Sequence, residues 1–547
     1  MKKFTKMAVA VMAVSALAVT GCGSSGSGSG PAAAVKTVTI NGQVSGVAIP
    51  AAATKSAAGA VGTVTALDAA TGKVISSPAT ADISADGSFS IKIAPPAGQT
   101  TVVLKATVNG SSYRLLITEQ LAADATVSGK LVGPDSESTA ALVLTDDDKI
   151  KTGVDVQKTL ERTRYGYVIN TGGGKGAGIS VIDRASTAVV KTINFTFAPS
   201  SNHFGNITAD GKELWLCTNK TGAAGDVNVF DLDKLRDVSS VTAENKATFI
   251  IKSWEGVGCG VQNTQSPSGQ YIFISSDQSP KGINVFDVQK KWYLGNIANE
   301  NTAPHVGAIS SDNKTYYTTT AGNSHTVAYD IEHLGHIATT ESAIAPETRR
   351  KLELPKVLDI DFGYGNLHAL RLHPGQKHLF VGNNTWPVPA GKTNTSGTNV
   401  IDLTTRKIIA RIDGRPHNYA VSPDVKYLLS TELPGQDCDV AILPTLETGN
   451  RLQFIDIATL LAATPDVSKL KAIYHFYTPN EGGSHAAWDL TTGILYYSIY
   501  ANADGQGYLY ALNTAGLSAA TPSVVQLSKT KIGWSPHGVS FPGVNGD

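Results

Sequence analysis

The chain repeats itself from Tyr165 to its end, with a period of roughly 40 to 70 residues. Each copy holds four short apolar segments separated by turn residues, a pattern typical of strands. The third segment of each copy ends in the same way, with an apolar residue followed by Asp or, in the last copy, Asn: Ile182-Asp183, Phe230-Asp231, Phe286-Asp287, Tyr329-Asp330, Ile401-Asp402, Ile455-Asp456 and Leu512-Asn513. We expect this short acceptor side chain to cap the turn that follows.

The order of the strands predicts a closed ring. The repeat region opens with second, third and fourth strands only, and it ends in a lone first strand at 537–541. That strand would complete the opening blade and remove the open sheet edges. First strands start at 203, 261, 305, 368, 417, 485 and 537. Residues 164–547 are therefore predicted to form a seven-bladed β-propeller closed by its C-terminal strand, in an all-β chain.

Six of the twelve histidines occupy one register of this repeat, each eight residues before the second position of a tight turn: His203, His305, His368, His417, His485 and His537. The second copy has Val261 at this register and Cys259 two residues earlier. Because first strands line the channel of a propeller, the six imidazoles are expected at one channel mouth. Imidazole clusters bind transition metals, so we predict that these histidines, with Cys259, bind copper or zinc.

Two long connections between second and third strands are expected on the same face. They are 383–397, which holds Trp386, and 433–450, which holds Cys438. Loops of this length are usually functional or disordered, and a protein partner would meet the chain here. Cys259 either fills the gap in the histidine ring or pairs with Cys438.

The N-terminus has the pattern of an export signal. A basic start, Lys2, Lys3 and Lys6, precedes an apolar stretch too short to span a bilayer comfortably. The stretch ends in Val19-Thr20-Gly21-Cys22, which resembles a bacterial lipobox. The resemblance implies a signal peptide at 1–21, lipidation of Cys22, and a Gly/Ser tether at 22–35. Gly23 after the lipidated Cys implies the outer membrane, on its periplasmic or cell-surface face.

Residues 36–132 alternate as short strands with turns such as Asp68-Ala69-Ala70-Thr71-Gly72 and Asp86-Gly87-Ser88-Phe89. This order resembles carboxypeptidase-regulatory-like β-sandwich domains, which implies a spacer or binding platform without catalysis. The polar stretch 133–163 is expected to be a linker with one short helix or strand.

Composition excludes some classes of partner. Lys and Arg number 45, as do Asp and Glu, so the net charge gives no electrostatic case for nucleic acid. The mature chain keeps Cys217, Cys259 and Cys438 besides Cys22, which is no disulfide framework. Cys217 is expected to be a free thiol in the core. The histidines outside the register are expected in surface or turn roles: His325, His333, His336, His373, His378 and His475.

The repeat resembles the YVTN family of β-propellers through Ser422-Pro423-Asp424-Val425-Lys426, Ser266-Pro267-Ser268-Gly269-Gln270 and Pro536-His537-Gly538-Val539-Ser540. The histidine pattern is similar to that of nitrous-oxide reductases, whose propeller blades offer histidines to a copper cluster. The chain departs from those enzymes because no blade carries a His-His pair and no second copper domain follows. Channel-mouth histidines also occur in haem-binding propellers, so a haem-type cofactor is the other candidate.

Three classes of function follow. The first is a cell-envelope lipoprotein that binds a metal or metal cofactor in metal handling or electron transfer. The second is a non-catalytic interaction or scaffold propeller, in which the histidines cap strands or fill the channel. The third is a lactonase-type hydrolase, for which the sequence offers no carboxylate or nucleophile set. Whether the chain is an enzyme is left open.

Overall fold

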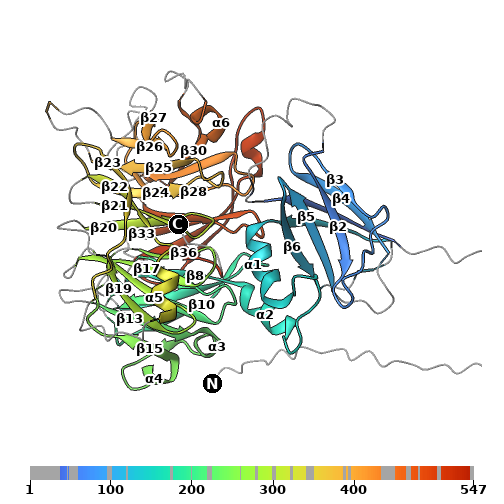
Figure 1. Cartoon of the computed structure of the whole chain (residues 1–547), viewed down its shortest axis with the longest axis horizontal. Coiled ribbons are helices and arrows are strands. Elements are labelled where there is room, and N and C mark those ends of the chain that lie inside the picture. Colours follow the sequence, from blue (N-terminus) through green and yellow to red (C-terminus); the bar gives the residue numbers. More distant parts are fainter. Residues whose placement is uncertain are drawn as a thin grey trace, which may run out of the picture. The chain divides into compact units, whose positions relative to one another are not determined.

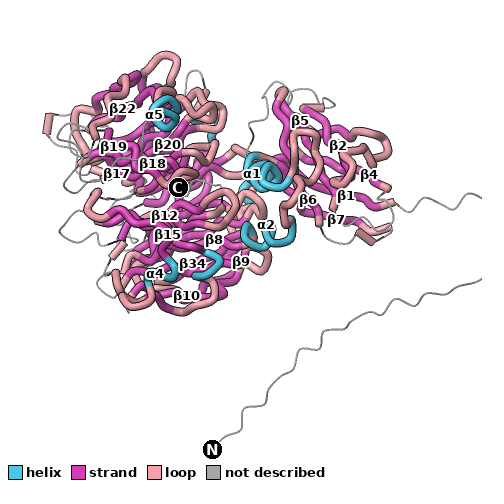
Figure 2. The backbone as a smooth tube through the Cα atoms, turned by 60° about the horizontal axis from the view of Figure 1, so that its bottom comes forward, coloured by secondary structure: helices cyan, strands magenta, loops and turns pink. Residues whose placement is uncertain are grey.

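The computed structural model describes residues 37–45, 47, 60–94, 101–118, 121–122, 124–172, 176–198, 200–201, 203–218, 225–258, 260, 262–276, 281–297, 303–320, 324–340, 350–385, 390–391, 396–432, 450–462, 470–478, 481–501 and 507–542. Strands make up most of it, and the helices are few and short, as Figure 2 shows. In the described residues, no helix has the length and apolar character needed to cross a membrane.

The N-terminal strands form one continuous sheet of order β6-β5-β2-β3-β4-β1-β7. They are β1 (Val38–Val44), β2 (Gly62–Asp68), β3 (Ala81–Ile83), β4 (Ser88–Ile93), β5 (Val102–Val108), β6 (Ser111–Ile117) and β7 (Thr126–Val132). Alternate side chains of β1, β2, β4 and β5 share one buried apolar core. β3 and β4 are joined by one residue pair, Ile83 opposite Phe89, and the β-sandwich stays a prediction.

The stretch 133–163 contains two helices, where one short helix or strand was expected. They are α1 (Pro134–Val143) and α2 (Val156–Thr163). Asp155 caps α2, because its side chain accepts a hydrogen bond from the backbone N–H of Lys158 at 2.9 Å. Apolar residues of both helices pack against Val103 and Leu116 of the sheet, which explains why this polar stretch is ordered.

The remaining described strands form the predicted seven-bladed propeller, and Figure 1 labels some of these strands. Blades are numbered along the chain from the first one whose four strands are consecutive in sequence. The first blade has β11 (Asn206–Ile207), β12 (Glu213–Thr218), β13 (Asp226–Asp231) and β15 (Ile250–Trp254), and the second has β16 (Asn263–Gln265), β17 (Tyr271–Ser276), β18 (Gly282–Asp287) and β19 (Trp292–Ile297). The third has β20 (Pro304–Ile309), β21 (Thr315–Thr320), β22 (His325–Asp330) and β23 (Lys356–Asp361).

The next three blades are β24 (Leu367–Leu372), β25 (His378–Asn383), β26 (Gly397–Asp402) and β27 (Lys407–Ile412); β28 (Pro416–Val421), β29 (Tyr427–Glu432), β30 (Asn450–Asp456) and β31 (Ala472–Thr478); and β32 (Gly482–Trp488), β33 (Ile494–Ala501), β34 (Tyr508–Asn513) and β35 (Val525–Lys531). Short helices lie between strands: α3 (Leu232–Leu235), α4 (Lys246–Phe249), α5 (Leu334–Thr340), α6 (Ile457–Leu460) and a 3₁₀ helix at Ala515–Ser518.

The seventh blade joins the two ends of the repeat region, as predicted. Its strands are β36 (Pro536–Ser540), β8 (Tyr165–Asn170), β9 (Ala177–Asp183) and β10 (Ala188–Phe195), with β14 (Ser240–Val241) added at its edge. β36 runs antiparallel to β8, with Pro536 opposite Asn170 and Ser540 opposite Tyr167. The last strand of the chain is thus the inner strand of the same blade as β8, β9 and β10, and this pairing removes an open sheet edge.

A buried ion pair lies beside this closure. Arg184, which follows β9, donates from Nε and Nη2 to the two carboxylate oxygens of Asp489 at 3.0 and 2.5 Å. Its Nη1 also donates to the carbonyl of Thr163 at 2.7 Å, and its guanidinium lies 5.2 Å from the ring centre of Phe541. One side chain therefore ties the sixth and seventh blades to the end of α2.

Two features of the repeat have the roles predicted for them. The second position of each described turn has a positive φ, although three of these residues are not glycine: Gly211, Gly269, Asn313, Gln376, Val425 and Gly493. The Asp or Asn after each third strand accepts a backbone N–H of the following turn or helix: Asp183, Asp231, Asp287, Asp330, Asp402, Asp456 and Asn513. The left-handed turn residue and the capping Asp or Asn explain why these sequence positions recur from copy to copy.

Candidate functional site: an arc of six histidines

The structure brings the six register histidines together in one arc. In blade order from His305 to His203, the ring centres of neighbouring imidazoles are 3.9, 4.4, 4.7, 5.6 and 4.1 Å apart: His305–His368, His368–His417, His417–His485, His485–His537 and His537–His203. The arc is interrupted at the second blade, whose register residue, Val261, lies outside the described residues, as does Cys259. Histidines at the same register of the repeat therefore lie close together in the structure.

Hydrogen bonds to neighbouring backbone fix the tautomer of three of these rings. Nδ1 of His305 lies 3.1 Å from the carbonyl oxygen of His368, and Nδ1 of His368 lies 3.0 Å from that of His417. Nδ1 of His537 lies 3.0 Å from the carbonyl oxygen of Ser535. Because a carbonyl oxygen only accepts, each Nδ1 must carry the hydrogen. In the neutral ring the lone pair is then on Nε2, the arrangement that metal-ligating histidines share.

The environment keeps at least two of the imidazoles neutral. Burial, and then the neighbouring histidines, lower the pKa of His368 and of His485 well below its ordinary value. A second positive charge in a row of imidazoles spaced at about 4 to 5 Å is unfavourable in a poorly solvated site. Neutral imidazole is the form that binds a metal ion.

The backbone that carries the histidines is anchored from blade to blade. Ser275 Oγ donates to the carbonyl of His305 at 2.9 Å, and Ser498 Oγ donates to that of His537 at 2.5 Å. The backbone N–H of Gly538 donates to the carbonyl of His203 at 2.8 Å. The positions of the imidazoles are thus set by the closed ring rather than by a flexible loop.

Two aromatic residues that the repeat pattern did not indicate lie against the arc. The ring of Phe204 meets that of His485 edge-on at 4.5 Å, and the ring of Tyr500 stacks on that of His537 at 5.3 Å. Neither belongs to a repeated motif, since Phe204 merely follows a register histidine and Tyr500 is near the end of β33. A single sequence therefore held no signal for them.

A buried carboxylate lies at the same end of the fifth blade. Glu432 is opposite Pro416, the residue before His417, and is 2% exposed. It accepts hydrogen bonds from Ser430 Oγ and from the backbone N–H of Arg415, both at 2.5 Å. Burial raises the pKa of Glu432. The second strands of the other blades end in uncharged residues such as Thr218 and Asn383, so this carboxylate is peculiar to one blade.

The imidazoles do not converge on one point. Among the residues that the structure describes, no three His, Cys, Asp or Glu side chains are placed as a group to hold an ion. Neighbouring rings stack or tilt against each other instead, with 20° between the planes of His203 and His537. The expectation that all six meet a single ion is therefore not met by these side-chain positions.

The cysteines differ from expectation at one position. Cys217 is fully buried, as predicted, but it is disulfide-bonded, not a free thiol. The other cysteines, Cys22, Cys259 and Cys438, lie outside the described residues, and so does the long loop 433–449. A disulfide is typical of an oxidising compartment.

Histidines outside the register stay apart from the arc. His373 accepts a hydrogen bond from the backbone N–H of Gly375 in a turn, and burial lowers its pKa to about 4. His325 pairs with Asp359 at 2.6 Å on the outer strands of its blade. These are the turn and surface roles that were predicted.

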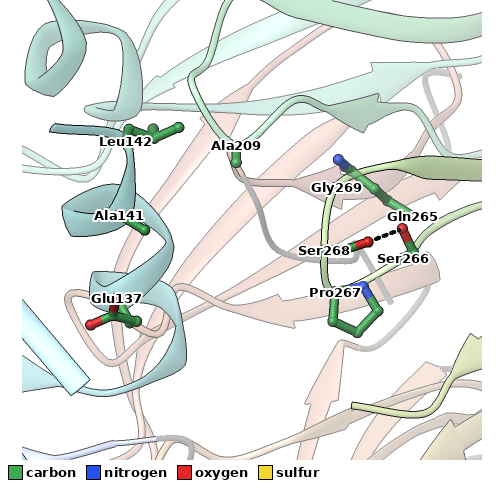
Figure 3. Close-up of a pocket in the computed structure, with 9 residues that line it drawn as sticks. All are labelled: Glu137, Ala141, Leu142, Ala209, Gln265, Ser266, Pro267, Ser268 and Gly269. Atoms are coloured by element: carbon green, nitrogen blue, oxygen red, sulfur yellow. Dashed lines mark hydrogen bonds between the residues drawn. The ribbon is translucent and has the colours of Figure 1, made fainter. Parts of the chain in front are cut away.

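A cavity of about 320 Å³ lies away from the histidines, between α1 and turns of the propeller (Figure 3). Its ionisable residue, Glu137, is already held by Arg114, whose Nη2 donates to Oε1 at 2.6 Å. Ser266 and Ser268 hydrogen-bond to each other across 3.1 Å. The cavity offers no reactive or metal-binding set among its lining residues.

Comparison with known proteins yields structural neighbours only. No protein-family model matches the chain, and no curated protein sequence is significantly similar. A dihydro-haem d1 dehydrogenase in complex with its ligand is 10% identical, with 70% of this chain and 76% of that chain covered and a TM-score of 0.43. A protein assigned as a 6-phosphogluconolactonase from Bacteroides fragilis is 12% identical, with 69% and 98% covered and a TM-score of 0.44. A protein of unknown function from Desulfotomaculum acetoxidans is 11% identical, with 69% and 99% covered and a TM-score of 0.45.

Proposed function

We propose that this chain is an exported, lipid-anchored protein of the cell envelope whose propeller binds copper or zinc through the histidine arc, in metal handling or electron transfer. One observation carries the proposal. The six register imidazoles lie in one arc, and three of them donate their Nδ1 hydrogens to backbone carbonyls, as metal-ligating histidines commonly do. Imidazole suits both copper and zinc, and the affinity of a given site for divalent ions generally peaks at copper.

The packing of the histidines suits a metal-binding role. Four of the six imidazoles are buried, and each lies within 6 Å of its neighbours in the arc. Such packing favours the neutral rings, because each charged form disfavours the next, and neutral imidazole is the form that binds a metal ion. The resident group, when bound, would supply Lewis-acid or redox chemistry, while this chain's residues hold it in place.

The test is metal retention by the folded full-length protein. The purified protein is loaded with Cu²⁺ or Zn²⁺, dialysed and analysed for bound metal, and its thermal unfolding is compared with that of the metal-free form. We expect stoichiometric retention and a higher unfolding temperature, because the metal binds only the folded state. The variant His203→Ala/His368→Ala/His485→Ala should lose both effects.

The exposed His333 provides a matched control, since it lies in a turn outside the arc. The variant His333→Ala should retain the metal in full. If the parent protein retains no copper or zinc and shows no thermal shift, the arc is structural and an interaction propeller is the better account. Retention of haem in place of the bare ions would point to a tetrapyrrole site.

A further inference from the structure

The backbone carbonyls of the register histidines receive hydrogen bonds from two kinds of donor. The first kind is a hydroxyl at the fifth position of the second strand in the preceding blade. Ser275 Oγ donates to the carbonyl of His305 at 2.9 Å, and Ser498 Oγ donates to that of His537 at 2.5 Å. In both cases this is the shorter of two contacts that the serine makes with carbonyls. The second kind is the Nδ1–H of the preceding register histidine, as between His305 and His368 at 3.1 Å.

Two blades contain only one of these donors, and each uses the one that it has. The second blade has Val261 at the histidine register, and there the hydroxyl of Ser275 is the donor. The fourth blade has Gly382 at the hydroxyl position, and there Nδ1 of His368 donates to the carbonyl of His417 at 3.0 Å. The hydroxyl and the imidazole are thus alternative donors to the same group of the next blade.

The third blade contains both donors and uses the imidazole alone. Thr319 is at the fifth position of β21 and is 0% exposed, and its hydroxyl has no hydrogen-bond partner among the described residues. The hydroxyl of Thr326, its cross-strand neighbour, does not bond to it either. Tyr317, on the same face of β21, packs against the apolar cluster that contains Leu367, so Thr319 faces the fourth blade as well. A buried hydroxyl without a partner is unfavourable and calls for an explanation.

The sixth blade makes the opposite choice. It also contains both donors, His485 and Ser498, and there the hydroxyl bonds to the next carbonyl. A hydroxyl at the fifth position therefore reaches that carbonyl even where an imidazole is at the register. In the third blade the same exchange requires the ring of His305 to turn away and the side chain of Thr319 to rotate. His305 is suited to this movement because it ends the arc, with Val261 at the register beyond it.

Building on the proposed metal-binding function, we infer that Thr319 is a positioning residue of the arc and that His305 is the imidazole that adapts to the ligand. When the ring of His305 turns toward a bound ion, the hydroxyl of Thr319 takes over the carbonyl of His368, so that no buried carbonyl loses its hydrogen bond. His368 has no such substitute, because Gly382 lacks a hydroxyl. The arc therefore adjusts at its His305 end while His368 stays fixed.

A double-mutant cycle on the metal-free protein tests this inference. Thr319→Val keeps the shape of the side chain and removes its hydroxyl. We expect it to leave the unfolding temperature of the parent unchanged or higher, and to lower that of His305→Ala by about 2 °C, the shift expected for one hydrogen bond. Thr319→Ser, which keeps the hydroxyl, should show no such difference between the two backgrounds. In the matched control Ser275→Ala, whose hydroxyl is already bonded, the unfolding temperature should fall in both.

A crystal structure of His305→Ala shows the exchange directly. We expect Oγ1 of Thr319 at hydrogen-bond distance from the carbonyl of His368, as Ser275 Oγ lies 2.9 Å from that of His305. A Thr319 hydroxyl that stays away from this carbonyl, or an equal effect of Thr319→Val in both backgrounds, would overturn the inference. So would the failure of both His305→Ala and the bulkier His305→Phe to fold, because the inference requires that the carbonyl be satisfied without the imidazole.

Titration with Zn²⁺ and with Cu²⁺ separates this inference from the proposed function. Thr319→Val should bind the ion about fivefold more weakly than the parent, because one hydrogen bond is lost when His305 turns, and Thr319→Ser should bind as tightly as the parent. Parent-like affinity of Thr319→Val would show that His305 does not turn on binding and would overturn the inference alone. If the parent binds neither ion, the proposed function fails, while the thermal cycle and the crystal structure still decide the role of Thr319.

Discussion

Removing the charge of Arg184 should destabilise the propeller more than removing almost any other single charge. The side chains of Arg184 and Asp489 are 7% and 0% exposed, so water screens neither. The pair shares two hydrogen bonds, and hydrogen bonds to charged groups contribute about 1.5–3 kcal/mol each. Arg184→Met would leave the carboxylate of Asp489 buried without its counter-ion. Breaking a buried pair in this way costs about 3–5 kcal/mol, so we expect the free energy of unfolding to fall by that amount.

Urea unfolding followed by tryptophan fluorescence measures this loss. The variant Lys314→Met removes an exposed ion pair with Glu332, whose side chains are 54% and 65% exposed, and it should leave stability nearly unchanged because water screens the pair. Replacing both partners, Arg184→Met with Asp489→Leu, should recover about 2 kcal/mol relative to the sum of the single variants. If Arg184→Met is no more destabilising than Lys314→Met, the closure does not depend on this pair.

Three further predictions concern closure, pH and location. Deletion of residues 536–547 removes β36 and leaves the inner edge of β8 unpaired, at about 1–3 kcal/mol for each buried group; heat stability equal to that of the parent would refute the closure. His373 stays neutral in the folded state until its pKa of about 4, so the unfolded chain binds its proton first, and stability should fall as pH drops from about 6.5 towards 4. The variant His373→Ser introduces the residue found at the same position of two other blades, Ser310 and Ser422, and it should flatten that part of the pH profile. An unchanged profile would show that His373 does not cause the loss of stability. Cys22→Ala should move the protein from the membrane to the soluble fraction, and continued membrane partitioning would count against the lipid anchor.

The propeller was predictable because its periodic residues have local causes. The Asp after each third strand caps a turn, and the turn eight residues after each histidine needs a left-handed residue, so both recur with the fold. Closure followed from counting strands at the two ends of the repeat. Local order in 133–163 was underestimated, because α1 and α2 are stabilised by packing against the sheet and their sequence is polar.

The histidine arc was predictable in membership but not in geometry. Equal register placed six imidazoles at one end of the channel, but the ring-to-ring distances depend on side-chain dihedrals and on hydrogen bonds between blades, which no periodicity encodes. The neighbours Phe204, Tyr500 and Glu432 occur in single blades and leave no repeated signal. The disulfide of Cys217 was missed because an apolar strand sequence, Leu214-Trp215-Leu216-Cys217, is equally typical of a core thiol.

X-ray absorption spectroscopy of the copper- or zinc-loaded protein tests the central claim most directly, since it reports the atoms bound to the metal. The account predicts a first shell dominated by imidazole nitrogen at about 2.0–2.1 Å, with the outer-shell scattering of the rings, and its loss in His203→Ala/His368→Ala/His485→Ala. A first shell of oxygen alone in the parent protein would contradict it, as would a spectrum that the triple variant leaves unchanged.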